Sequence, residues 1–261
     1  MNDDLLQRAR TLTASAPKRE LPSGASAIET ARTYMREAKA GLDVYLAFDT
    51  TGSMDSYIDE VRSHIDEVTT PLLDGSADIR LSINGVGDHY DGANMLQLYA
   101  PTAKPAEVRG AMESIVMTNG GDEPEAYECL ALALAQYIPT DSPTRRRAVV
   151  LIGDSVPHGM LDGPCERGVE YKRAFEALKV LTDGFYMVGC NPQMYAHQRA
   201  LVDPAKPDRE QFIPLGDMAE VLPALLVALA KKTESAASLN SYLKQLGGAQ
   251  AEQIRGLLGR G

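Results

Sequence analysis

The chain has 261 residues, 44% of them hydrophobic and 24% charged, which is the composition of a globular protein that can bury a core without disulfides. Its 26 basic and 36 acidic side chains give a formal net charge of -10, which argues against a nucleic-acid binder because such proteins need a basic face. The three cysteines lack C-x-x-C spacing, which disfavours both a disulfide framework and a zinc site. We find no apolar signal core and no apolar run of membrane-spanning length, and therefore expect a cytoplasmic protein without membrane attachment.

The first half of the chain alternates between helical and strand patterns. Residues 1–40 are expected to form a polar leader and a helix over residues 27–39. The nearly continuous hydrophobic run Val44–Phe48 is typical of a parallel strand covered on both faces. Apolar residues at helical spacing then predict a helix that starts near Met54 and ends at Pro71. A second strand, Ile79–Val86, is closely followed by Leu96–Tyr99, which we interpret as an antiparallel edge strand.

The second half continues this alternation. Pro105 is expected at the first position of a helix. The elements expected after it are a helix over 126–137, a strand at Ala148–Gly153, a helix over Tyr171–Leu181, strands at Phe185–Cys190 and 211–215, and a helix over about 217–231. Together these elements predict a doubly wound, mostly parallel α/β sheet with one antiparallel edge strand and helices on both faces, a Rossmann-like domain over residues 41–232. Residues 233–261 have an amphipathic pattern and are expected to add a helical tail.

Polar side chains follow the first predicted strand in the segment LAFDTTGSM. Asp49, Thr51 and Ser53 stand at alternate positions there, at the sheet edge where doubly wound folds bind ligands. Three oxygen-bearing side chains in one turn suit a hard cation such as Mg²⁺. A capping interpretation also stays open, in which Ser53 caps the next helix and Asp49 accepts backbone N–H groups.

Two further loops bring acidic residues to the same predicted edge. Asp154 directly follows the strand AVVLIG, and Asp122 stands in the loop TNGGDEPEA, where it could instead cap a helix. Three carboxylates from three loops repel one another unless a cation lies between them. The sequence therefore predicts a divalent metal site with Asp49, Thr51, Ser53, Asp122 and Asp154 as ligands.

The motif Asp49-x-Thr51-x-Ser53, the GGDEPEA loop and the strand-end Asp154 resemble the metal-ion-dependent adhesion site (MIDAS) of von Willebrand factor A (vWA) domains, most of all in the intracellular and kinase-associated branch. The resemblance covers residues 42–232. It implies direct metal contacts from Thr51 and Ser53 and contacts through water from Asp49 and Asp154. The family usually has a threonine in the third loop, and here Asp122, or alternatively Thr118, takes that place.

The resemblance implies a non-catalytic module that binds a protein partner through Mg²⁺ or Mn²⁺. Because Mg²⁺ prefers six oxygens and seldom takes all of them from one protein, we expect the partner to supply an Asp or Glu carboxylate. The resemblance also implies that AAA+ ATPases, or kinase and phosphatase modules, work together with this chain.

Other residues near the predicted edge are expected to have roles other than binding the metal. Asp88 is interpreted as a group behind the metal ligands or as a loop cap, and His89, Tyr90 and His158 as residues on the rim. Cys129 and Cys190 are interpreted as core thiols.

Three other functions remain open. Asp49 after a strand also fits a haloacid-dehalogenase-type phosphohydrolase with Asp49 as nucleophile, although such enzymes normally have an acid where Thr51 stands. Ser155 in Gly-Asp-Ser fits a serine hydrolase, but no late Asp-x-x-His supplies its base. A metal-free structural scaffold is the third alternative.

Overall fold

The computed structural model describes residues 41–74, 79–121, 123–139, 145–207 and 209–215. The predictions made for residues 1–40, for the helix over residues 217–231 and for the tail 233–261 lie outside the described residues. The domain boundaries proposed from the sequence therefore stay predictions at both ends.

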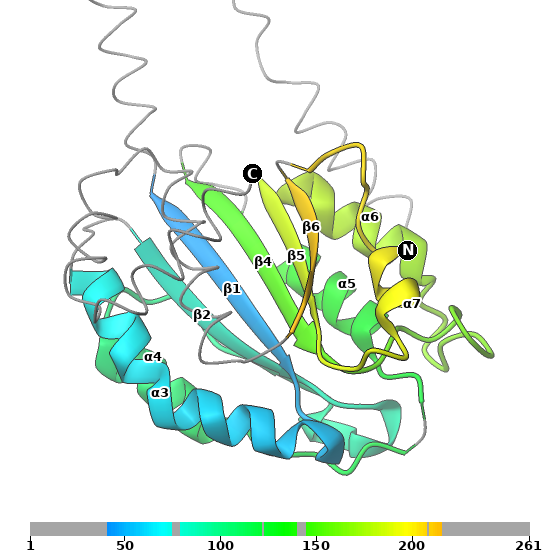
Figure 1. The fold of residues 1–261 in the computed structure, drawn as a ribbon, viewed down its shortest axis with the longest axis horizontal. Coiled ribbons are helices and arrows are strands. Elements are labelled where there is room, and N and C mark those ends of the chain that lie inside the picture. The colour runs from blue at the N-terminus through cyan, green and yellow to red at the C-terminus, as the bar shows by residue number, and fades with distance from the viewer. Residues whose placement is uncertain (1–40, 75–78, 122, 140–144, 208, 216–261) are drawn as a thin grey trace, which may run out of the picture.

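A six-stranded sheet forms the centre of the domain, with the strand order β3-β2-β1-β4-β5-β6 (Figure 1). Every neighbouring pair is parallel except β2 and β3. The sheet confirms the mostly parallel arrangement with one antiparallel edge strand. Its strands are β1 (Leu42–Asp49), β2 (Ile79–Val86), β3 (Leu96–Leu98), β4 (Arg146–Gly153), β5 (Gly184–Gly189) and β6 (Glu210–Pro214).

Helices cover both faces of the sheet, which makes three layers (Figure 1). The helices α3 (Asp55–Asp74) and α4 (Pro105–Ser114) lie on one face, and α5 (Tyr127–Tyr137) and α6 (Tyr171–Leu181) on the other. Two 3-10 turns, η1 (Gly52–Met54) and η2 (His89–Asn94), follow β1 and β2, and the short α7 (Tyr195–Arg199) follows β5. None of the described helices is both long and apolar enough to cross a membrane.

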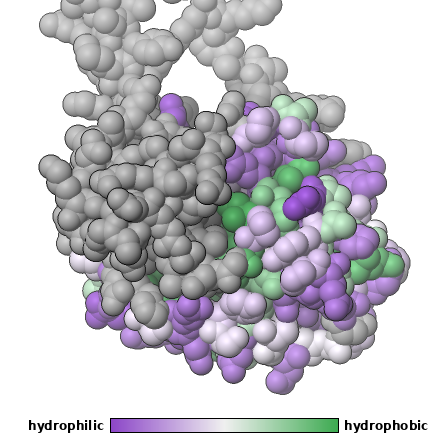
Figure 2. Space-filling view, viewed as in Figure 1, coloured by the Kyte–Doolittle hydropathy of each residue, from purple (hydrophilic) through white to green (hydrophobic). Residues whose placement is uncertain are grey.

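Alternating side chains of the central strand contribute to two separate cores. Val44, Leu46 and Phe48 pack with α3 and α4, whereas Tyr45 and Ala47 pack with α5 and α6. All five are buried, as expected for a strand with helices on both faces. On the face shown in Figure 2, the described surface is mostly hydrophilic with a few hydrophobic residues between.

The prediction that Pro71 ends its helix was wrong, because α3 continues to Asp74. A proline inside a helix removes one backbone hydrogen bond. Leu73, in the turn beyond Pro71, is buried in the core on that face of the sheet. Packing of this turn offsets the lost hydrogen bond, and tertiary contacts of that kind cannot be seen in the local pattern.

Candidate functional site

Asp49 is the last residue of β1, and its side chain is fully buried. Its Oδ1 accepts hydrogen bonds from the Thr51 backbone N–H at 2.9 Å and from Thr51 Oγ1 at 2.6 Å. Its Oδ2 accepts a short hydrogen bond from the Tyr127 hydroxyl at 2.5 Å. These bonds hold the carboxylate in one orientation at the end of the central strand.

Thr51 and Ser53 lie in the turn that leads from β1 into η1. Thr51 is buried and Ser53 is exposed, and their hydroxyl oxygens are 3.4 Å apart. The capping interpretation holds in part: Asp49 accepts the Thr51 N–H, but the N-cap residue of η1 is Thr51, which makes no side-chain capping bond. Because Thr51 Oγ1 donates its proton to Asp49, its lone pairs are available to a cation.

Asp154 follows β4, the strand beside β1. The last paired residues of these two strands are Phe48 and Ile152. The residues that follow them, Asp49 and Gly153, therefore lie side by side at the two strand ends. A Cβ atom on Gly153 would lie 2.0 Å from the Tyr127 hydroxyl oxygen and 3.1 Å from Asp49 Cβ. Glycine is therefore required where the two strand ends approach each other, and it brings Asp154 next to the Asp49 turn.

The loop after α4 reaches the same turn. The Thr118 N–H donates to the Thr50 carbonyl at 2.8 Å, and the hydroxyls of these two threonines are 3.1 Å apart. Gly120 has a positive φ of 61°, and a Cβ atom there would lie 3.2 Å from Thr51 Cγ2. Asp122 lies outside the described residues, so its role as a ligand stays a prediction.

Glu125 is a carboxylate at this edge that the sequence pattern did not single out. It is 5% exposed, and its Oε2 has no hydrogen-bond partner among the described residues. A Cβ atom on Gly120 would lie 3.2 Å from its Oε1, which places this oxygen against the same loop. Its only signal in the sequence was membership of the acidic GGDEPEA loop, which does not distinguish it from the neighbouring acids.

Burial raises the pKa values of two acids at this edge, Asp49 and Glu125. It raises the pKa of Asp49 to about 7, against the lowering effect of the bonds from Thr51 and Tyr127, and the charge of Asp154 raises it further. It raises the pKa of Glu125 to about 10, with added repulsion from Asp49, Asp88 and Asp91. The ionised forms of these two carboxylates are therefore disfavoured unless a positive charge lies close to them.

The opposite edge of the sheet shows the contrast. Asp43 is buried near the start of β1, but Arg80 donates to both of its oxygens at 2.7 and 2.6 Å, and Arg145 adds a bond at 2.9 Å. Burial raises the pKa of Asp43, but the two arginines outweigh it and leave the pKa below its ordinary value. Among the described residues, no Lys or Arg forms an ion pair with Asp49, Glu125 or Asp154.

Of the residues expected around this edge, Asp88 and Tyr90 lie where they were predicted, whereas the two histidines do not. Asp88 is the N-cap residue of η2, and its Oδ1 lies 3.4 Å from His158 Nε2. Tyr90 is 68% exposed and its ring lies against Gly121, so it does line the rim. His89 and His158 do not, because their side chains are 3% and 9% exposed.

His158 lies between two carboxylates. Its burial lowers its pKa, but its hydrogen bond to Glu128 and the charges of Glu128 and Asp88 outweigh this and leave the pKa raised. Its backbone N–H also donates to Glu128 Oε2 at 3.1 Å.

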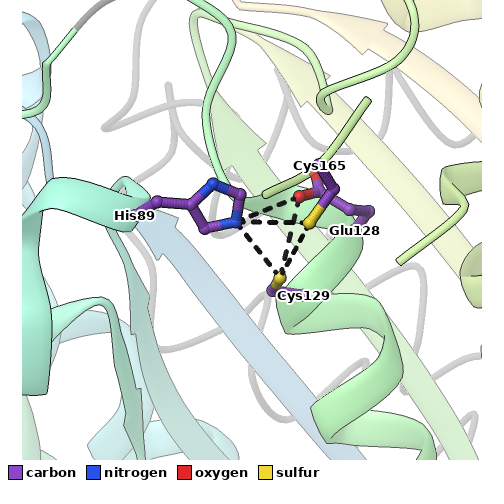
Figure 3. Close-up of side chains that lie close together, drawn as sticks. All are labelled: His89, Glu128, Cys129 and Cys165. Atoms are coloured by element: carbon purple, nitrogen blue, oxygen red, sulfur yellow. Dashed lines mark hydrogen bonds and ion pairs between the residues drawn. The ribbon is translucent and has the colours of Figure 1, made fainter. Parts of the chain in front are cut away.

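A second group of potential ligand atoms lies beside the first site. His89, Glu128, Cys129 and Cys165 place one ligand atom each within 4.8 Å of the others (Figure 3). The cysteine spacing disfavoured a zinc site, yet the fold brings together two cysteines that are 36 residues apart. Cys190 lies in the core as expected, whereas Cys129 lies in the core and also contacts His89.

Neither a protein-family model nor a curated protein matches the sequence. Solved structures do match. The pilus adhesin SpaC from Lactobacillus rhamnosus GG matches in two crystal structures, one of them in an open conformation, with TM-scores of 0.56 and 0.53 and identities of 11% and 10%. These matches cover 74% and 78% of this chain and 30% of the adhesin in each case.

Proximal thread matrix protein 1 from the mussel byssus matches with a TM-score of 0.51 and 13% identity, over 74% of this chain and 48% of that protein. At such identities the likeness establishes the fold alone. This chain also spans less than half the length of either protein. The described domain has a vWA-like α/β fold, with a mostly parallel sheet between two layers of helices.

Proposed function

We propose that this chain is a non-catalytic, divalent-metal-dependent protein-binding module. In this proposal Thr51 and Ser53 contact Mg²⁺ or Mn²⁺ directly, and Asp49 and Asp154 hold it through water. Asp122 remains the proposed third-loop ligand, and Glu125 is a further carboxylate of the same loop. When bound, the metal supplies positive charge and one coordination position that a partner's oxygen can fill.

The observation that carries the proposal is the group of acids without a basic partner at one sheet edge. Asp49 is fully buried, Glu125 is 5% exposed, and the described residues offer them no Lys or Arg ion pair. Buried charge is costly unless it is compensated. The donors are carboxylate and hydroxyl oxygens, which suit a hard cation.

The surface around this edge supports binding of another protein. Ser53 is exposed beside the buried Asp49 and Thr51, so a metal at this turn would face the solvent. Tyr90, 68% exposed beside Gly121, offers an aromatic contact of the type enriched in protein interfaces. We propose an Asp or Glu of the partner as the anion at the metal. An AAA+ ATPase, kinase or phosphatase neighbour and a cytoplasmic location remain proposals from the sequence resemblance.

The geometry of this edge disfavours two alternative functions. A phosphohydrolase would need Asp49 as a nucleophile, but both oxygens of Asp49 accept hydrogen bonds and the side chain is fully buried. In a metal-free scaffold, no positive charge would offset the burial and the repulsion that raise the pKa values of Asp49 and Glu125. Both arguments favour the binding module.

The function is tested with the full chain as bait in a pull-down carried out with Mg²⁺, with EDTA, and with EDTA followed by excess Mg²⁺. We expect a partner that is captured with Mg²⁺, lost with EDTA and regained on Mg²⁺ addition. The Ser53→Ala bait should lose it, whereas Ser56→Ala, which alters an exposed serine at the start of α3, should retain it. Capture that survives both EDTA and Ser53→Ala would show that this edge is not the interface.

A further inference from the structure

Four side-chain atoms beside the first site surround a common point. His89 Nε2 lies 3.4 Å from Cys129 Sγ, 3.4 Å from Cys165 Sγ and 3.5 Å from Glu128 Oε1. Cys129 Sγ lies 3.6 Å from Cys165 Sγ and 3.6 Å from Glu128 Oε1. Figure 3 shows His89 approaching from one side and the other three side chains facing it.

Hydrogen bonding does not account for this arrangement. A neutral His89 has one ring proton, so an Nε2–H group can point well at only one of its three neighbours. His89 Nδ1 is buried without a hydrogen-bond partner among the described residues. The two thiols are weak hydrogen-bond donors and acceptors, so their contacts at 3.4–3.6 Å contribute little as hydrogen bonds.

The distances match those between the ligands of a tetrahedral metal ion. Ligands at bond lengths of ~2.0–2.3 Å in a tetrahedron around Zn²⁺ are separated from one another by ~3.3–3.8 Å. The five distances given above all lie between 3.4 and 3.6 Å. Two sulfurs, one imidazole nitrogen and one carboxylate oxygen are also ligand types that Zn²⁺ accepts. We propose that His89, Glu128, Cys129 and Cys165 form a Zn²⁺ site separate from the proposed Mg²⁺ site.

The surroundings of the cluster indicate a structural zinc site. The side chains of His89 and Glu128 are 3% and 0% exposed, and Cys129 and Cys165 are 5% and 4% exposed, so four protein ligands would enclose the ion. A catalytic zinc site keeps one position open to water or substrate, and this cluster offers none.

His158 fixes two of the four ligands. Its backbone N–H donates to Glu128 Oε2, and its ring Nδ1 lies 3.3 Å from Oε1, the oxygen that also faces the cluster. Its ring stacks on that of His89 at a centroid distance of 4.5 Å. Groups of this kind, placed behind the ligands, orient them in metal sites.

A zinc ion here would connect three segments that also shape the first site. His89 belongs to η2 after β2, Glu128 and Cys129 to the first turn of α5, and Cys165 to the loop between β4 and α6. Tyr127, which donates to Asp49, directly precedes Glu128. The zinc site would therefore hold the start of α5, and with it Tyr127, in place.

The test measures metal bound to the full chain, purified with a thiol reductant after expression in zinc-supplemented medium. We expect one Zn²⁺ per chain by elemental analysis, and loss of most of it in the Cys129→Ser/Cys165→Ser double variant. Cys190→Ser removes the third cysteine, which is buried elsewhere in the core, and should retain zinc. Ser53→Ala should retain it too, which separates this site from the proposed Mg²⁺ site.

A second measurement does not depend on the folding of a variant. Replacing zinc with Co²⁺ in the wild-type chain should give thiolate-to-cobalt charge-transfer absorption and the intense d–d bands of tetrahedral cobalt. A wild-type chain that binds neither ion when reduced, or whose purified form holds a Cys129–Cys165 disulfide and no metal, would overturn the proposal. Full zinc retention in a folded double variant would overturn it as well.

Discussion

At the scale of single residues, burial sets the charge of the candidate Mg²⁺ site. Asp49, Glu125 and Tyr127 are all buried, and Tyr127 reaches Asp49 from 78 positions along the chain. The hydroxyl of Tyr127 supports the ionised form of Asp49, whereas burial, together with the charges of Asp49 and its neighbours, raises the pKa of Glu125. Metal binding at this edge should therefore depend on residues that need not contact the ion.

The first residue-scale prediction is a stability that falls with pH in the metal-free chain. The pKa of Asp49 is about 7 in the folded state against an ordinary 3.8, so the folded state binds more protons than the unfolded state between these values. Its contribution to the free energy of unfolding is complete below pH 4 and is lost as the pH rises to about 7. Glu125, with a folded-state pKa of about 10, extends the loss to higher pH.

The measurement is the melting temperature in EDTA from about pH 5 to about pH 9. Asp49→Asn should flatten the decline only below pH 7, and Glu125→Gln should flatten it above pH 7 as well. The pKa of His158 is also raised, so His158 likewise makes the stability fall as the pH rises. The comparison of each variant with the wild type therefore shows which residue causes which part of the decline. A Glu125→Gln profile as steep as the wild type above pH 7 contradicts the prediction.

The second residue-scale prediction concerns the hydrogen bond from Tyr127 to Asp49. Tyr127→Phe removes a bond to a buried carboxylate, and bonds to charged groups contribute ~1.5–3 kcal/mol. We expect the affinity for Mn²⁺ to fall by about tenfold or more, measured by titration calorimetry. Tyr137→Phe, at the exposed end of the same helix, serves as the control and should bind as the wild type does. Equal affinities for both variants would show that Tyr127 does not support the site.

At the scale of elements, the site depends on how closely the ends of β1 and β4 approach. Their register places Gly153 beside Asp49, and the start of α5 closes over both through Tyr127. The proposed ligand oxygens come from separate strands and loops. If one strand end moves, these oxygens therefore no longer lie close together.

The prediction at this scale compares two glycines of the β4 region. Gly153→Ala places a Cβ atom 2.0 Å from the Tyr127 oxygen, so either the strand end or Tyr127 must move. We expect a loss of about 1–3 kcal/mol in the free energy of unfolding and a weakened stabilisation by metal. Gly163→Ala meets nothing within 4 Å and should change neither quantity. Denaturant unfolding with and without Mn²⁺ measures both, and identical results for the two variants would disprove the packing argument.

A further element-scale prediction concerns α4, away from the site. Gly110 lies inside this helix, and a Cβ atom there would meet nothing within 4 Å. Because glycine costs a helix interior roughly 0.5–1 kcal/mol relative to alanine, Gly110→Ala should stabilise the chain by about that amount. Its response to Mg²⁺ should equal that of the wild type. Thermal unfolding that shows a lower melting temperature for Gly110→Ala would contradict this.

At the scale of the whole molecule, the two edges of the sheet differ in charge compensation. Asp43 has Arg80 and Arg145 at one edge, while Asp49, Glu125 and Asp154 at the other edge form no ion pair with a Lys or Arg among the described residues. The formal net charge of -10 adds to the repulsion there. A bound cation should therefore stabilise the folded domain as a whole.

The whole-molecule prediction is a higher melting temperature with Mg²⁺. A metal that binds only the folded state stabilises it by ~2.7 kcal/mol at 100 times its dissociation constant, which corresponds to roughly 5–10 °C for a domain of this size. The shift should be absent in Ser53→Ala and Asp49→Ala and unchanged in Ser56→Ala. Asp49→Ala also relieves repulsion, so the readout is the loss of the Mg²⁺ response and not the starting melting temperature. An equal shift in all variants would place the stabilising metal elsewhere.

The sequence by itself determined the sheet and the positions of its strand-end oxygens. Buried strands produce continuous hydrophobic runs, so β1 and β4 were recognisable, and parallel strands of one sheet end at one edge, so Asp49 and Asp154 could be placed together. The antiparallel β3 followed β2 too closely for a crossover connection. Helix ends were less predictable, as α3 beyond Pro71 shows, because tertiary packing decided them.

Only the tertiary structure decided which distant side chains meet. Glu125 and Tyr127 occupy ordinary positions in the sequence, and their importance comes from burial beside Asp49. His89 turned inward from the expected rim, and Cys129 and Cys165 met without any local spacing motif. The physical reason is that periodicity and short motifs report contacts between near neighbours in the chain. Side chains contributed by separate loops are brought into contact only when the strands that carry those loops pair and their helices pack.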